Sequence, residues 1–266
     1  MLLSGRDLAS YIKERHYQQI RALGFAPKLA IVLSTQANAA TQSYVRGTKS
    51  RYSGDIGAEV VVLESTGPTD KLVKLIEQLN ADPSVNGIII QTPFAGVELD
   101  IALAAVSPTK DVDGLGLRPV FDPATAKGIL WLLSSYGIDW KDKTVTVVGQ
   151  GRLVGQPISN MLDNSQAKVI RCDINTNDLR AATLKADIVI TAVGKPNLIT
   201  AGMVNPGTVV VDAGTAELDG NLVGDVDRAL YDDESLKITP NPGGVGPMTV
   251  AALFDNLILA AAGRKQ

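Results

Sequence analysis

The sequence contains one cysteine and one histidine among 266 residues, and each shortage excludes a class of site. A single cysteine, Cys172, cannot form an intramolecular disulfide or a zinc site built from several thiolates. A single histidine, His16, excludes a Ser-His-Asp triad unless that residue serves it. We expect His16 to be a surface or packing residue and Cys172 to behave as a small apolar one. No metal site is predicted, so the chemistry must rest on other polar side chains or on a bound cofactor.

Positive charge and long apolar runs are also scarce. The chain has 25 Lys and Arg against 28 Asp and Glu, a net charge of −3, so no broad basic surface for nucleic acid or an acidic membrane is expected. Asp255 and Asn256 interrupt the most apolar helix candidate, 250–262, before it reaches the ~18 residues of a membrane span. The segment 1–7 lacks the layout of a signal peptide. These features predict a folded cytoplasmic protein that binds neither nucleic acid nor a membrane.

Short β-branched runs alternate with longer amphipathic stretches along most of the chain. The runs are apolar on both faces, which is typical of parallel strands covered by helices on both sides. An α/β protein with parallel sheets is therefore predicted. Strands are expected at 28–33, 59–63, 87–91, 144–148, 168–172, 187–193 and 208–212, and helices at 4–23, 41–54, 70–81, 125–137, 154–162, 177–186 and 246–262.

The length and two interruptions of the pattern predict two domains. Typical domain size gives a prior of nearly two, and proline-rich segments break the pattern at 117–123 and 239–244. The final helix is so apolar that it needs burial, which the first domain could supply. We therefore predict one domain formed by 1–138 and 243–266, completed by the C-terminal helix, and a second formed by 139–242.

A glycine-rich turn follows the strand expected at 144–148. Gly149 permits a tight turn, Gly151 allows a close approach of pyrophosphate, and Gly155 allows close packing of the following helix. The backbone N–H groups and the dipole of that helix favour a phosphate. This predicts a Rossmann-type dinucleotide-binding domain, although the spacing is one residue longer than the common fingerprint.

An acidic residue, Asp173, follows the next strand, 24 residues after Gly149. An acid there can accept both ribose hydroxyls of NAD and repel the 2′-phosphate of NADP. Two alternatives to this interpretation stay open. The glycines can simply form the turn that enters a helix, with Asp173 on the surface, or a phosphate can pair with Arg152 or Arg171.

The first domain carries polar residues where strands are expected to end, which is where open α/β sheets bind ligands. Gln91 directly follows a buried strand, and Asp113 lies in an acidic turn at 110–114. Tyr44 and Lys49 share an expected helix. Taken singly, Tyr44 is a packed ring, Lys49 is a solvated charge, and the other two residues belong to ordinary turns. Together, the lysine, the amide and the aspartate suggest a set of base, amide and acid. A lysine base must be partly neutral, which burial or a neighbouring cation such as Arg46 would favour.

The sequence carries eight ordered motifs, of which Lys-Asp-Val-Asp-Gly and Pro-Gly-Gly-Val-Gly-Pro-Met-Thr are the most specific. The motifs lie at 40–44, 91–93, 110–114, 123–128, 154–157, 192–196, 224–226 and 242–249. On these motifs the chain resembles, nearly end to end, the bifunctional methylenetetrahydrofolate dehydrogenase/methenyltetrahydrofolate cyclohydrolase family.

The resemblance implies an N-terminal catalytic domain that binds folate, a dinucleotide-binding domain and a homodimer in one-carbon metabolism. It implies oxidation of 5,10-methylenetetrahydrofolate to 5,10-methenyltetrahydrofolate with a nicotinamide cofactor, followed by hydrolysis to 10-formyltetrahydrofolate. The implied catalytic residues are Lys49, Gln91 and Asp113, and the substrate-binding residues are Tyr44, Gln91, Asp113, Pro242, Gly243 and Gly244. The implied cofactor-binding residues are Gly149, Gln150, Gly151, Val154, Gly155, Asp173, Val193, Gly194 and Thr215.

The chain departs from the family pattern at three places. Tyrosine and lysine are four positions apart in the family and five apart here, so we expect an inserted residue that shifts Tyr44 relative to Lys49 and affects the hydrolytic step. The segment 115–122 is shorter than usual, so part of the wall beside Asp113 is expected to be absent. The family's Arg-Ser and Cys-His-Ser are replaced by Gln150-Gly151 and 172–174, which favours NAD over NADP.

Three other functions remain open on the sequence. They are an NAD-linked dehydrogenase without hydrolytic activity, a dehydrogenase for another small substrate, and a folate- or dinucleotide-binding protein without turnover.

Overall fold

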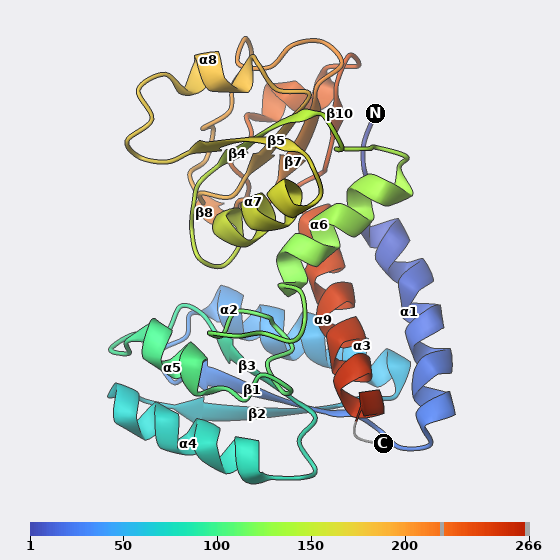
Figure 1. Cartoon of the computed structure of the whole chain (residues 1–266), viewed down its shortest axis with the longest axis vertical. Coiled ribbons are helices and arrows are strands. Elements are labelled where there is room, and N and C mark those ends of the chain that lie inside the picture. The colour runs from blue at the N-terminus through green and yellow to red at the C-terminus, as the bar shows by residue number, and fades with distance from the viewer. Residues whose placement is uncertain (219–220, 264–266) are drawn as a thin grey trace. The chain divides into compact units, whose positions relative to one another are not determined.

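The computed structural model describes residues 1–218 and 221–263 (Figure 1). The chain forms two compact units. The lysine unit comprises Ser10–Ala124 and Val250–Gln266, and the glycine-loop unit comprises Met1–Ala9 and Thr125–Thr249. Helices α1 (Gly5–Leu23) and α9 (Val245–Ala262) each begin in the glycine-loop unit and end in the lysine unit. The functional boundaries after residues 138 and 242 stay a prediction.

The lysine unit contains a parallel sheet with the strand order β2–β1–β3. Helices α4 and α5 pack on one face of this sheet, where side chains of the central strand meet leucines and isoleucines of the helices. β1 is buried along almost its whole length, which explains its continuous apolar sequence. The strands are β1 (Lys28–Ser34), β2 (Glu59–Ser65) and β3 (Gly87–Gln91), and the helices include α4 (Thr69–Ala81) and α5 (Leu99–Ala105).

The single histidine is a packing residue of the lysine unit, as expected. His16 is fully buried; its Nδ1 lies 3.0 Å from the hydroxyl of Tyr52, and its Nε2 lies 3.3 Å from Oδ1 of Asp255. The Tyr52 ring stacks on Phe254, so this polar cluster is continuous with the apolar core of α9.

The glycine-loop unit contains a five-stranded parallel sheet with the order β10–β7–β6–β4–β5. Numbered along the chain within this sheet, the order is 2-1-3-4-5, a doubly wound arrangement whose direction reverses between β4 and β6. Its elements are α6 (Ala124–Ser135), β4 (Thr144–Val148), α7 (Gly155–Asn164), β5 (Lys168–Cys172), α8 (Leu179–Thr183), β6 (Ile188–Thr191), β7 (Val209–Asp212), the hairpin β8 (Ala216–Leu218) and β9 (Asn221–Val223), the 3₁₀-helix η2 (Arg228–Asp232) and β10 (Lys237–Ile238).

All seven predicted strands are present and pair in parallel, which confirms the α/β prediction. Two elements are at least three residues shorter than predicted. β6 ends at Thr191 rather than at residue 193, because the next N–H groups turn toward the carboxylate of Asp225. α8 begins at Leu179 because the side chain of Asp178 caps it by accepting the N–H of Ala181.

The last helix, α9, is long and apolar, and most of it is buried. By length and composition α9 could cross a membrane, with a mean hydropathy of 1.6, but 67% of it is buried in the structure, as in the core helix of a soluble protein.

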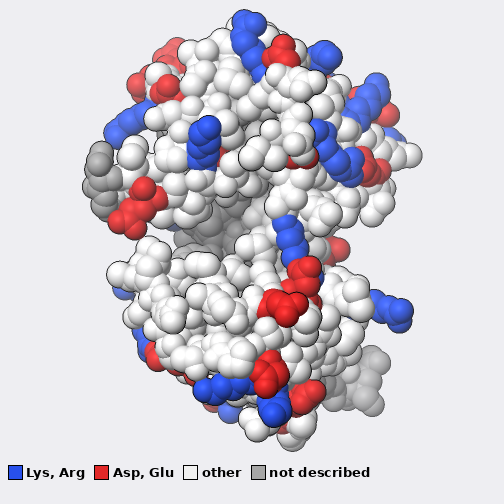
Figure 2. Space-filling view, turned by 90° about the vertical axis from the view of Figure 1, so that its left-hand side faces the viewer, with Lys and Arg blue, Asp and Glu red and all other residues white. Residues whose placement is uncertain are grey.

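On the face drawn in Figure 2, Lys and Arg side chains are interspersed with Asp and Glu on the surface of each unit.

Candidate active site

One π-helical turn brings Tyr44 and Lys49 together. The helix expected at 41–54 consists of α2 (Ala39–Ser43), a π-helix η1 (Tyr44–Lys49) and α3 (Ser50–Ile56). The N–H of Ser50 donates to the carbonyl of Val45, five residues earlier, which is the bond that defines a π-turn. This turn absorbs one additional residue without ending the helix. Nζ of Lys49 therefore lies 5.1 Å from the centroid of the Tyr44 ring, despite the five-residue spacing.

Lys49 is held by an amide at the end of β3. Its side chain is buried, and its Nζ donates to Oε1 of Gln91 at 2.8 Å. Nε2 of Gln91 in turn donates to the carbonyl of Thr92 at 3.1 Å. Because this second bond occupies the donor end of the amide, its acceptor end must face the lysine. The structure thus places three sequence-predicted residues, Tyr44, Lys49 and Gln91, in one cluster.

Burial makes Lys49 a stronger candidate base than an ordinary lysine. Desolvation lowers its pKa to about 8, while the carboxylate of Asp113 acts in the opposite direction. Burial also raises the pKa of Asp113, and Lys49 opposes that shift. The alternative cause, a neighbouring Arg46, does not apply, because its guanidinium is exposed and pairs with Glu64 at 2.7 Å.

The other charged residues of the 110–114 turn build the turn that carries Asp113. Nζ of Lys110 is buried and donates to three backbone carbonyls, of Leu79, Asn80 and Asp82, each at 2.7 Å. It thereby satisfies acceptors at the C-terminal end of α4.

Asp111 and Asn256 complete this turn. The carboxylate of Asp111 accepts the N–H groups of Gly114 and Gly116 at 3.0 and 2.7 Å. Nδ2 of Asn256, from α9, donates at 2.9 Å to the backbone carbonyl of Val112, within the turn, and to that of Asp122. The sequence predicts no role for either residue, although Asp111 is one of two acids in the 110–114 turn and Asn256 is a polar residue within the apolar segment 250–262.

The glycine turn after β4 fits a dinucleotide phosphate. Gly149 has φ of +90°, and a Cβ at Gly155 would lie 1.7 Å from the carbonyl oxygen of Gly149, so the fold itself requires both glycines. A Cβ at Gly151, by contrast, would meet nothing within 4 Å. The backbone there is open beside the N-terminus of α7, as an approaching pyrophosphate requires. Val154 is the residue that precedes this helix.

The reversal of strand order brings a second loop beside the glycine turn. In doubly wound sheets a ligand binds at the carboxyl ends of the strands on either side of such a reversal, here β4 and β6. A Cβ at Gly149 would lie 2.6 Å from the carbonyl oxygen of Ala192, and one at Gly194 would lie 3.1 Å from that of Thr215. The predicted residues Gly149, Val193, Gly194 and Thr215 therefore belong to adjoining loops.

A buried carboxylate shapes the loop after β6. Asp225 is fully buried and accepts the N–H groups of Val193, Gly194 and Lys195 at 2.7 to 2.8 Å. It also accepts the hydroxyl of Thr191 at 2.6 Å. Three consecutive N–H groups directed at one carboxylate fix the loop conformation. Asp225 lies in the 224–226 motif, to which the sequence analysis assigned no role.

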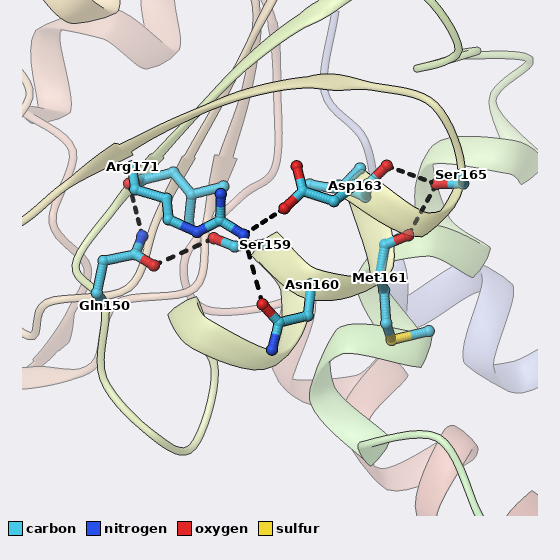
Figure 3. Close-up of polar contacts among 9 residues, drawn as sticks. Gln150, Ser159, Asn160, Met161, Asp163, Ser165 and Arg171 are labelled. Carbon is cyan, nitrogen blue, oxygen red and sulfur yellow. Dashed lines mark hydrogen bonds and ion pairs between the residues drawn. The ribbon is translucent and has the colours of Figure 1, made fainter.

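Asp173 and Gln150 differ in their availability to a ligand. Asp173 is exposed and follows β5, and its Oδ1 accepts the N–H of Asn175 within a turn. The side chain of Gln150 folds back on its own unit: its Nε2 donates to the carbonyl of Val147, and its Oε1 accepts the hydroxyl of Ser159 (Figure 3).

Three further predicted residues lie elsewhere. Pro242, Gly243 and Gly244 belong to the glycine-loop unit, where the carbonyl of Gly243 accepts the N–H of Arg6 at 3.0 Å. Within residues 1–218 and 221–263, no group of three or more His, Cys, Asp or Glu is arranged to hold a metal ion.

Comparison with known proteins gives consistent matches over nearly the whole chain. The model of the catalytic domain of tetrahydrofolate dehydrogenase/cyclohydrolase matches residues 3–113, and that of its NAD(P)-binding domain matches residues 123–265. The bifunctional protein FolD of Francisella tularensis subsp. holarctica is 39% identical over 278 residues, which covers 98% of both chains.

Two solved structures share the fold over nearly their full length. The bifunctional FolD methylenetetrahydrofolate dehydrogenase/cyclohydrolase of Campylobacter jejuni has a TM-score of 0.92 and 37% identity, over 99% of each chain. The FolD enzyme of Trypanosoma brucei, solved with NADP and an inhibitor, has a TM-score of 0.91 and 28% identity, over 100% of this chain and 98% of its own.

Proposed function

The chain belongs to the tetrahydrofolate dehydrogenase/cyclohydrolase family, and from this we propose that Lys49, Gln91 and Asp113 carry its chemistry and that NAD is its preferred cofactor. The enzyme oxidises 5,10-methylenetetrahydrofolate to 5,10-methenyltetrahydrofolate and hydrolyses this product to 10-formyltetrahydrofolate. The observation that carries the catalytic assignment is the buried Lys49, which is bonded to Gln91 and has a pKa of about 8.

Lys49 is the proposed base of the hydrolytic step. The oxygen of a water molecule adds to the methenyl carbon, and a water proton passes to the neutral Nζ of Lys49. A ring C–N bond then breaks: its nitrogen takes up the proton that Lys49 returns, and the new hydroxyl group loses its own proton to solvent as it becomes the formyl carbonyl. Gln91 keeps the amine in place, because its own orientation is fixed by Thr92. Burial lowers the pKa of Lys49 to about 8, and Asp113 opposes part of this shift by favouring the charged amine.

Tyr44 and Asp113 are proposed to bind the folate. Tyr44 offers a half-buried ring for stacking, and the π-turn holds that ring beside Lys49. The carboxyl group of Asp113 offers oxygens for hydrogen bonds with the pterin. On the family motif at 242–249 we further propose that Pro242, Gly243 and Gly244 contact the substrate.

The glycine-loop unit is proposed to bind NAD. When bound, the nicotinamide accepts a hydride from the one-carbon bridge of the folate. Gly149, Gly151 and Gly155 would hold the pyrophosphate, and Asp173 would accept the hydroxyls of the adenosine ribose. The neighbouring Ile174 is 98% exposed and offers no hydrogen-bond donor to a 2′-phosphate. NADP in the trypanosomal structure is a property of that relative, so the preference for NAD rests on this chain's own residues.

The test is an assay of both activities with NAD and NADP side by side. We expect reduced nicotinamide to form from methylenetetrahydrofolate with a higher kcat/KM for NAD, and the absorbance of methenyltetrahydrofolate to decay faster than without enzyme. Binding of both ligands without turnover would contradict the catalytic proposal. Asp173→Asn should lower the ratio of kcat/KM values for NAD over NADP, and an unchanged ratio would contradict the role of Asp173.

Domain boundaries, assembly and location are part of the same proposal. The functional domains are residues 1–138 with 243–266, and 139–242. The enzyme acts as a cytoplasmic homodimer, in keeping with the resemblance and with the buried, unpaired Cys172. Sedimentation of the purified protein at the mass of one chain would contradict the homodimer.

A further inference from the structure

A cation beside the proposed ribose site is already paired within the protein. Arg171 lies on β5, and its Nη2 contacts the carboxylate of Asp163 and Oδ1 of Asn160, the latter at 3.4 Å. Both partners lie on α7, three residues apart and therefore on one face of that helix. Figure 3 shows the three side chains directed toward one another between the strand and the helix. Arg171 and Asp163 are each about two-fifths exposed, at 41% and 43%.

Arg171 is placed to meet the phosphate that distinguishes NADP from NAD. It lies two residues before Asp173, and both residues are exposed. Two residues of chain span at most ~7 Å. An extended arginine side chain covers the resulting ~7 Å between their Cα atoms. The N–H of Gly149 donates to the carbonyl of Cys172 at 2.8 Å, so this end of β5 adjoins the glycine turn.

We propose that Asp163, assisted by Asn160, excludes NADP by holding the guanidinium of Arg171 on α7. This inference rests on the proposed preference for NAD and names a second specificity residue besides Asp173. Asp163 and Asp173 each carry one negative charge and Arg171 one positive charge, so the group has a net charge of −1. A 2′-phosphate bears nearly two negative charges and would have to compete with Asp163 for the arginine.

The pair can be separated from folding because it is exposed. Exposed ion pairs contribute little to stability, so Asp163→Asn should leave the fold intact. The substitution removes one negative charge and releases Arg171 to rotate toward a phosphate. The net charge of the group then rises from −1 to zero. With Asp173→Asn as well, it rises to +1.

The experiment measures binding by calorimetry rather than turnover. The probes are NAD, NADP, AMP and adenosine 2′,5′-bisphosphate. We expect Asp163→Asn to tighten binding of the bisphosphate and of NADP by about five-fold, the effect of one charge at ~4 Å in water, and to leave AMP and NAD unchanged. Asp173→Asn should weaken NAD and AMP, and the double variant should bind the bisphosphate more tightly than either single variant.

Two controls isolate the arginine. Arg171→Gln added to Asp163→Asn should remove the gain; a gain that survives would show that another cation, such as Arg152, receives the phosphate, and would overturn the proposal. Asp142→Asn removes an equal charge from an exposed position just before the amino end of β4, whereas the glycine turn follows the carboxyl end of that strand, and should change nothing. The gain should also shrink in 0.5 M salt, as expected for exposed charges.

The outcomes distinguish this inference from the function on which it rests. If Asp163→Asn leaves the affinity for the bisphosphate unchanged while Asp173→Asn raises it, the preference for NAD stands and the role of Asp163 is wrong. If the wild-type protein binds NADP as tightly as NAD, the proposed preference is wrong, and the five-fold gain in Asp163→Asn still tests whether Asp163 restrains Arg171.

Discussion

Replacing Lys49 with methionine should abolish hydrolysis and, at neutral pH, stabilise the protein. Burial lowers the pKa of this lysine from 10.5 to about 8, and its side chain is only 5% exposed. Keeping this buried lysine charged therefore lowers the free energy of unfolding of the wild type at pH 7 by about 3 kcal/mol, and Lys49→Met removes this cost. The variant also loses the hydrogen bond with Gln91, which destabilises it by about 1 kcal/mol. Lys49→Met should therefore unfold with a free energy about 2 kcal/mol higher than that of the wild type.

The sign of this effect depends on pH in a defined window. The folded-state pKa lies below the unfolded-state value, so between pH 8 and 10.5 the unfolded chain binds more protons than the folded one. The wild type therefore gains stability as the pH rises through this window, and Lys49→Met does not. By pH 10.5 the advantage of the variant should have disappeared.

The same shift predicts the pH dependence of hydrolysis. At pH 7 a lysine with a pKa of 8 is neutral in about one tenth of the molecules, against fewer than one in a thousand for an ordinary lysine. The wild-type hydrolysis rate should thus rise roughly ten-fold between pH 7 and 9 and then become constant.

Urea unfolding and methenyltetrahydrofolate decay provide the assays. Lys13→Met is the matched control, since Lys13 is an exposed lysine of α1 and its replacement should change the free energy of unfolding by less than about 0.5 kcal/mol. A Lys49→Met protein that is less stable than the wild type at pH 7 would refute the desolvation argument. A hydrolysis rate that continues to rise toward pH 10.5 would refute the lowered pKa.

Four further substitutions test the surrounding architecture. Gly151→Val should leave thermal unfolding unchanged, because the space at Gly151 is open, and should abolish NAD binding in calorimetry. Gly155→Ala, by contrast, should prevent folding of the glycine-loop unit. Unimpaired NAD binding by Gly151→Val would contradict the phosphate assignment. Lys110→Met should lower the free energy of unfolding by about 3 kcal/mol, since one buried and two partly buried backbone carbonyls lose their donor; a change under about 1 kcal/mol in urea unfolding would contradict this. Asp225→Asn should raise the KM for NAD at least ten-fold with a smaller change in kcat, because an amide cannot accept three N–H groups at once; equal changes in both constants would argue against positioning of the loop.

The strands could be predicted because burial alone dictates their composition. A parallel strand covered on both faces must be apolar throughout, and the segments of β1, β4 and β7 meet this condition. The same argument fails for β10, whose two residues are too few to form a pattern, and for α5, whose seven residues show less than two full helical turns. Neither carries enough periodic signal.

The interactions that hold the turn around Asp113 have no sequence signature. Lys110 and Asn256 donate to backbone carbonyls that are 28 to 144 residues away in the chain. Every residue supplies a carbonyl, so composition cannot identify the acceptor. The charges of the turn suggested chemistry. In the structure Asp113 acts on the pKa of Lys49, whereas the side chains of Lys110 and Asp111 bond to the backbone around the turn.

The spacing of Tyr44 and Lys49 shows why a motif count can mislead. Sequence reasoning assumes an α-helical period, under which a residue added between them would rotate the tyrosine away from the lysine. A π-turn lengthens a single turn of helix by one residue and so restores the alignment of its two ends. The geometry needed for a base beside an aromatic ring is therefore retained with a five-residue spacing. The five-residue spacing is therefore explained by a π-helical turn and does not count against hydrolytic activity.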